Sequence, residues 1–119
     1  MNRHQSGYAK LNMKPPHRRA VMRNQVIHLI KFGMLQTTSV RAKAVQRMAE
    51  KMVTIARKGR DFNVIRRLKK ELPYDAKAVD KLINDIAPKY VERRGGYTRV
   101  YSLGKRVSDT ASISRLEWV

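Results

Sequence analysis

No acidic residue occurs in this chain before Glu50. The first 49 residues carry ten lysines and arginines and all three histidines, but no aspartate or glutamate. Because like charges repel, such a segment destabilises its own compact state unless something neutralises it. Nucleic acid is the obvious polyanion for this role, since its phosphates release condensed counterions when lysine and arginine approach.

The composition describes a small folded domain with a cationic extension. The chain has 119 residues, 27 basic and nine acidic, and its 42% hydrophobic content is too high for a wholly disordered tail. We expect an extended basic arm over residues 1–14 and a single domain over residues 15–119. No run approaches the roughly 20 apolar residues that cross a bilayer. The N-terminus also lacks the apolar segment of a secretory signal, so we expect a cytoplasmic protein, with an organellar origin left open.

Hydrophobic spacing and turn residues predict four helices and three strands. The order is helix, strand, three helices and two strands, an α+β fold whose helices pack on one face of a small mixed three-stranded sheet. The first helix is expected over residues 15–32, ending at Gly33. The second is capped by Thr38 or Ser39 and ends near Gly59. The third and fourth follow caps at Asp61 and Asp75 and end at Pro73 and Pro88. The strands are expected over residues 34–38, 97–103 and 111–119.

The titratable residues argue against an enzyme. His4, His17 and His28 all lie within the first 28 residues, with no spacing of three or four between them, and there is no cysteine. Metal ligation and general acid–base catalysis both need such groups held close together. No phosphate loop or dinucleotide motif is present. We therefore expect no enzymatic activity, no cofactor and no metal.

The first basic cluster runs from the arm into the first helix and is expected to follow phosphates; a solvated tail is the alternative. A second, shorter cluster begins the second helix, where a solvated helix face is an equally good interpretation. The first cluster comprises Arg3, His4, Lys10, Lys14, His17, Arg18, Arg19 and Arg23, and the second comprises Arg41, Lys43 and Arg47.

A third cluster lies in the segment KYVERRGGYTR, residues 89–99. Arg93, Arg94 and Arg99 surround the pair Gly95-Gly96, where a glycine backbone can approach a phosphate closely. Tyr97 could stack on an unpaired base, but we favour its being a core residue beside an ordinary turn. Lys105 and Arg106, in the last turn, also belong to the predicted RNA-binding set.

Three segments resemble the bacterial large-subunit ribosomal protein L-seventeen family, in the right order and over nearly the whole chain. The most specific is IAPKYVERRGGYTRV, residues 86–100, beside the family's IAPRY and GGYTR signature. The last turn departs from the family in having Ser108 where it has glycine, and residues 61–72 are the least similar, so nothing is transferred to them. The other matching residues are Arg3, His4, Gly7, Leu11, Asn12, His17, Arg18, Arg19, Ala20, Arg23, Asn24, Thr37, Thr38, Arg41, Ala42 and Lys43.

The resemblance implies a structural constituent of the large ribosomal subunit, bound to large-subunit ribosomal RNA near the polypeptide exit region. It adds Asn24 to the predicted RNA-binding residues and implies neighbouring ribosomal proteins as partners, with the chain a monomer within the ribosome. From the residues alone, a nucleoid-type architectural DNA-binding protein stays open as the alternative. An RNA-modifying or processing enzyme is a third class, disfavoured by the absence of an active-site constellation.

Overall fold

The computed structural model describes residues 13–119, so the predictions for Arg3, His4 and Lys10 lie outside the described residues. Four α-helices and three strands follow in the expected order. The fourth helix continues through a π-helical turn, η2, and a 3-10 turn, η3. The helices are α1 (Pro15–Phe32), α2 (Ser39–Ala56), α3 (Phe62–Glu71), α4 (Ala76–Lys81), η2 (Leu82–Ile86) and η3 (Ala87–Tyr90), and the strands are β1 (Met34–Thr38), β2 (Thr98–Lys105) and β3 (Ser112–Trp118).

The three strands form one sheet in the order β1-β3-β2, and both pairs are antiparallel. The predicted α+β class is confirmed, but the expectation of a mixed sheet is wrong. The reason is the position of β3, which lies between the two strands that run in the same direction. Because β1 and β2 never pair with each other, the sheet contains no parallel ladder.

Local sequence signals set the ends of α1. Pro15 and Pro16 occupy the first helical positions, where their missing N–H groups need no partner. The helix ends at Gly33, which has φ +78° and donates its backbone N–H to the Leu29 carbonyl over 2.9 Å. This left-handed conformation favours glycine and turns the chain directly into β1.

The predicted caps are confirmed in part. The Asp75 carboxylate accepts the Ala78 N–H over 3.0 Å and so caps α4. Asp61 and Thr38 stand at the cap positions of α3 and α2, but their side chains make no capping hydrogen bond. Pro88 does not end the last helix as expected, because it lies in the first turn of η3, where a proline is tolerated.

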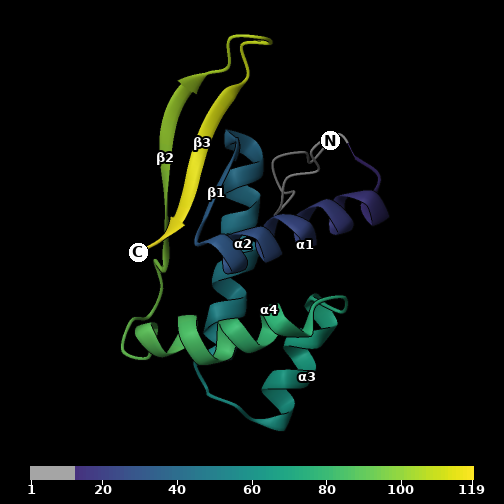
Figure 1. Cartoon of the computed structure of the whole chain (residues 1–119), viewed down its shortest axis with the longest axis vertical. Helices are drawn as coiled ribbons and strands as arrows, with labels where there is room; N and C mark the ends of the chain where they lie inside the picture. The colour runs from purple at the N-terminus through teal and green to yellow at the C-terminus, as the bar shows by residue number, and fades with distance from the viewer. Residues whose placement is uncertain (1–12) are drawn as a thin grey trace, which may run out of the picture.

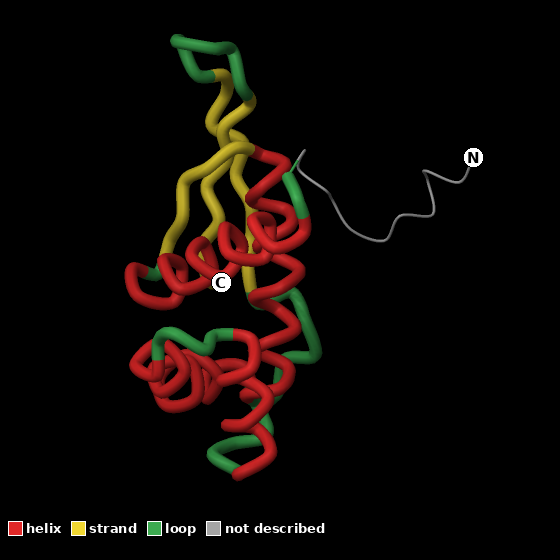
Figure 2. The backbone as a smooth tube through the Cα atoms, turned by 90° about the vertical axis from the view of Figure 1, so that its right-hand side faces the viewer, coloured by secondary structure: helices red, strands yellow, loops and turns green. Residues whose placement is uncertain are grey.

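Helix α2 joins the two halves of the molecule. It contacts all three strands as well as α1, α3 and η2. Figures 1 and 2 show the sheet beside the first part of α2, and α3 and α4 beyond the end of the sheet, around the last part of α2. The expectation that every helix covers one sheet face therefore holds for α1 and α2 and is wrong for α3 and α4. The hairpin of β2 and β3 projects past the helices at the opposite end from α3.

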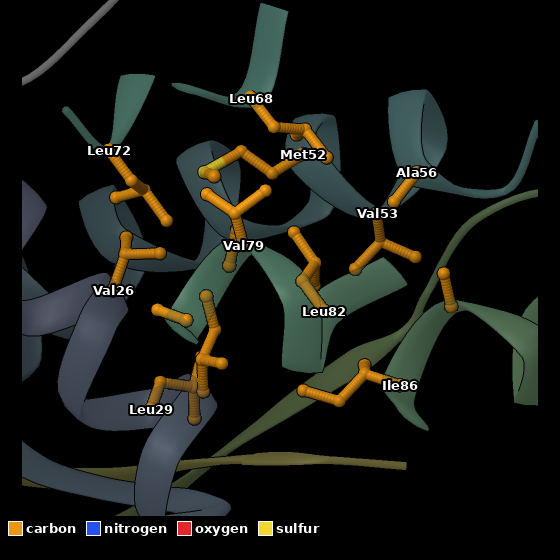
Figure 3. Close-up of a cluster of buried hydrophobic side chains, with 14 of the residues drawn as sticks. Val26, Leu29, Met52, Val53, Ala56, Leu68, Leu72, Val79, Leu82 and Ile86 are labelled. Carbon is orange, nitrogen blue, oxygen red and sulfur yellow. The ribbon is translucent and has the colours of Figure 1, made fainter. Parts of the chain in front are cut away.

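One hydrophobic cluster joins the helices and extends to the sheet. Figure 3 shows Leu29 of α1, Met52 and Val53 of α2, Leu68 of α3 and Val79 of α4 converging between the ribbons. Each of these side chains is almost completely buried. Full burial of an aliphatic side chain contributes about 1.5–3 kcal/mol, so this cluster is the main source of stability.

A polar stripe on α2 holds the start of β2. One oxygen of the Glu50 carboxylate accepts both the Thr98 backbone N–H, over 3.1 Å, and the Thr98 hydroxyl, over 2.7 Å. Arg57 donates to the Tyr97 hydroxyl over 3.0 Å and to the Val91 carbonyl over 2.7 Å. The sequence predicted a basic cluster only at the start of α2; further along the helix, Glu50 and Arg57 pack against the segment that enters the sheet.

We predict that Glu50→Ala lowers the free energy of unfolding by about 1–3 kcal/mol, because the buried Thr98 loses the acceptor of two hydrogen bonds. Urea denaturation followed by circular dichroism measures the change. Glu92→Ala is the control, since Glu92 is exposed, and its effect should be much smaller. Equal stability of the two variants would contradict this role of Glu50.

Candidate nucleic-acid interface

The N-terminal half of α1 carries the densest part of the predicted site. His17, Arg18 and Arg19 are consecutive, so successive side chains leave the helix about 100° apart and cover most of its circumference. The first turn contains no acidic residue. Cations at this end oppose the helix dipole, and a phosphate placed here would relieve the conflict. Lys14 and Asn24 are exposed and Arg23 is half-buried.

The second cluster lies at the start of α2, directly after β1. Lys43 is exposed and Arg41 is half-buried, and the first turn of α2 also lacks an acidic residue. In Figure 1 this end of α2 lies beside the base of the projecting hairpin. The helix dipole again favours an anion at this position.

The double-glycine turn between η3 and β2 exposes two arginines. Arg93 and Arg94 are exposed, and Arg93 Nε donates to the Gly95 carbonyl over 3.3 Å. Gly96 has φ +62°, a conformation that other residues rarely adopt. From within the molecule, Arg57 holds the same turn through the Val91 carbonyl. The turn therefore presents its cations from a fixed backbone.

Tyr97 is a core residue, which is the interpretation that the sequence favoured over base stacking. Its side chain is only 1% exposed, its ring centroid lies 5.3 Å from that of Tyr90, and its hydroxyl accepts from Arg57. A ring buried in this way cannot stack on a base. Arg57 is the residue that sequence reasoning missed; the only signal was its place on a helical stripe with Glu50 and Thr54.

Arg99 lies on the sheet face opposite the helices. Its Nε donates to one Glu117 oxygen over 3.2 Å, while Arg115 lies 3.2 Å from the other oxygen. The Arg99 guanidinium also lies 5.5 Å from the ring centroid of Tyr101. Two arginines share one carboxylate here, so this face keeps a net positive charge and an oriented guanidinium.

The hairpin tip has its own hydrogen-bonded structure around Arg106. Two guanidinium nitrogens of Arg106 donate to the two Asp109 oxygens, over 3.0 and 2.7 Å. The Ala111 N–H donates to the same carboxylate over 3.1 Å. These interactions lower the pKa of Asp109 to about 2, with the Arg106 hydrogen bonds as the largest cause. Arg106 is thus partly neutralised, whereas its neighbour Lys105 is exposed.

The predicted cations do not form one patch. In Figure 1 the start of α1 lies on one side of the molecule, the turn between η3 and β2 on the other, and the hairpin tip at one end. The structure brings the start of α2 near the base of the hairpin but leaves the double-glycine turn apart. Basic groups thus face several directions around a single hydrophobic cluster.

The titratable side chains of residues 13–119 do not gather into a metal site. That range contains no group of three histidine, cysteine, aspartate or glutamate side chains able to hold a metal ion. Within the same range, none of the helices is long and apolar enough to cross a membrane. The fold and surface define a small basic α+β protein whose distinctive chemistry is its charge.

The chain belongs to the ribosomal protein L17 family, whose model matches residues 21–119. It is 45% identical over 114 residues to the large ribosomal subunit protein bL17 of Clostridium acetobutylicum, covering 96% of this chain and 98% of that relative. The protein of the same name from Desulforudis audaxviator is 45% identical over 113 residues, 95% of this chain and 99% of the relative. The predicted family is confirmed, and the DNA-binding alternative gains no support.

We predict that the Asp109 carboxyl titrates near pH 2 in the native chain and that Arg106→Gln moves its midpoint up toward the ordinary value of 3.8. The pKa of the Asp109 carboxyl is lower in the folded turn than in the unfolded chain. The ion pair therefore stabilises the tip above pH 3.8 and is lost as the pH falls toward 2. An NMR titration of the carboxyl carbon measures both midpoints. Arg115→Gln is the charge-matched control, and a native midpoint at 3.8 would contradict the assignment.

Proposed function

We propose that this chain is a structural constituent of the large ribosomal subunit that binds large-subunit ribosomal RNA. Its relatives carry the name of a large-subunit protein and match it over nearly their whole length. The proposed mechanism is electrostatic: lysine and arginine neutralise phosphates where RNA segments converge. No catalytic step is part of it.

One observation carries the proposal: the predicted cations include several that have no partner among residues 13–119 and that lie on different elements. Arg19 on α1, Lys43 on α2 and Arg94 in the double-glycine turn make no hydrogen bond or ion pair with any described residue. Unpaired cations around a small body fit a ligand that surrounds it. Folded RNA can surround a small protein, whereas a DNA duplex bound to one face cannot.

Recognition should depend on RNA shape rather than on base sequence. Tyr97, the aromatic residue expected to be able to stack on a base, is buried, and most of the other predicted residues are basic. Contacts to phosphates fix position and orientation without reading bases. If six to ten phosphates are contacted, affinity should fall by roughly three to five decades between about 50 and 200 mM salt, by analogy with duplex DNA.

The N-terminal arm and the position of the protein in the large subunit are also part of the proposal. We propose that residues 1–14, with Arg3, His4 and Lys10, follow the RNA backbone as an extension of the basic start of α1. Residues 15–119 then form the single domain from which this arm extends. The family resemblance suggests a place near the polypeptide exit region, a monomeric state within the particle and other large-subunit proteins as neighbours.

We predict that replacing Arg93, Arg94 and Arg99 together with alanine weakens binding to large-subunit ribosomal RNA. Each lost phosphate contact should reduce the slope of log affinity against log salt by about 0.7–0.9, so the triple variant should lose roughly two to three units of slope. Filter binding over a range of salt concentrations measures this slope. Circular dichroism checks that the variant keeps its fold.

The matched control replaces Lys51, Lys58 and Lys77 with alanine, which removes the same charge from exposed positions outside the predicted set. This control should keep the slope close to that of the native chain. An unchanged affinity in the arginine variant, or an equal loss in the lysine control, would refute the proposed contacts.

A further inference from the structure

Helix α3 carries a strongly basic surface that is not part of the interface described above. Four of its ten residues are lysine or arginine, and all four side chains are exposed: Arg66, Arg67, Lys69 and Lys70. The opposite side of the helix is fixed, because Val64 and Leu68 are buried in the hydrophobic cluster. The four cations therefore stand on a helix anchored to the body.

These four cations make no hydrogen bond or ion pair with any described residue. The ion-paired carboxylates of the neighbouring α4 region are bound elsewhere, Asp75 to Lys31 over 2.8 Å and Asp80 to Arg60 over 3.0 Å. Like charges this close on a helix repel each other. An external polyanion would remove this repulsion.

An exposed aromatic ring begins the same helix. Phe62 is 77% exposed and precedes Arg66 by four positions, which places the two side chains as neighbours on the helix surface. Aromatic rings and arginine planes are the groups on which unpaired RNA bases and sugars stack. The centres of protein–protein interfaces, in contrast, are depleted in lysine. The chemistry of α3 thus favours RNA over another protein.

We propose that α3 binds a second segment of ribosomal RNA, so that the protein bridges two RNA segments at opposite ends of its body. Both views place α3 at the end of the molecule away from the hairpin tip. One RNA segment meets the hairpin and the other meets Arg66, Arg67, Lys69 and Lys70. This inference rests on the proposed ribosomal RNA binding and adds a site that residues 61–72 were not expected to contain.

The chain has no cysteine, so single cysteines can carry a tethered hydroxyl-radical probe. Asn63→Cys places the probe on the exposed surface of α3, and Ser108→Cys places it at the hairpin tip. Each full-length variant is assembled into large subunits, and the cleaved nucleotides are mapped by primer extension. We expect both probes to cleave ribosomal RNA, at segments separated from each other in the RNA.

The outcomes separate this inference from the proposed function. Cleavage from Ser108→Cys without cleavage from Asn63→Cys would overturn the α3 site and leave ribosomal RNA binding intact. It would also be the result expected if a protein covers α3. Failure of both variants to enter the particle or to cleave RNA would overturn both proposals. Cleavage of the same nucleotides by both probes would overturn the bridge.

A charge-neutral variant tests the four side chains directly. Replacing Arg66, Arg67, Lys69 and Lys70 with glutamine should abolish cleavage from the α3 probe and reduce the salt slope of binding by about three. Glutamine keeps good helix propensity, and circular dichroism confirms folding. The control replaces an equal number of exposed lysines, Lys51, Lys58, Lys77 and Lys89. Equal losses in both variants would overturn a specific site on α3.

Discussion

The contact between Glu50 and Thr98 organises this structure. It joins the middle of α2 to the first residue of β2, 48 positions away, and it uses the first acidic residue in the chain. Carboxylates are scarce here, and those that form ion pairs or hydrogen bonds mostly connect distant segments. Asp75 joins α4 to α1, Asp80 binds Arg60, and Glu117 holds Arg99 across two strands. Because so few anions are available, many cations remain without a partner in the part of the chain that the structure describes.

This scarcity explains how a hydrophobic fold and a cationic surface can coexist. One cluster of aliphatic side chains stabilises the body, so folding does not depend on pairing every charge. The surplus charge then faces outward from α1, α2, the double-glycine turn, the hairpin and α3. An RNA that surrounds the protein would neutralise these groups together, whereas isolated surface ion pairs contribute little.

Local signals in the sequence predicted most of the fold. Gly33 and the proline pair set helix ends through their backbone preferences, Asp75 does so through its side chain, and hydrophobic spacing predicted where the helices lie. The antiparallel order of the sheet depends on β3 pairing with β1 across more than 70 residues, which no local pattern encodes. The burial of Tyr97 depends in the same way on tertiary packing, because Arg57 binds the Tyr97 hydroxyl from a position 40 residues away.

The candidate site was predictable in kind but not in arrangement. The sequence identified the basic clusters, but it assigned no ligand to the cations of α3. Only the fold shows that α3 and the hairpin lie at opposite ends of the molecule. Their separation depends on α2, which runs from the sheet to α3 and α4. Charge patterns report composition along the chain, and tertiary packing decides which groups face which direction.

If ribosomal RNA neutralises the cationic surplus in the working state of the protein, a tagged full-length chain should sediment with the large ribosomal subunit through a sucrose gradient at moderate salt. RNase digestion should then release the chain from the subunit. A chain found mainly in the fractions free of ribonucleoprotein would show that RNA does not neutralise these groups.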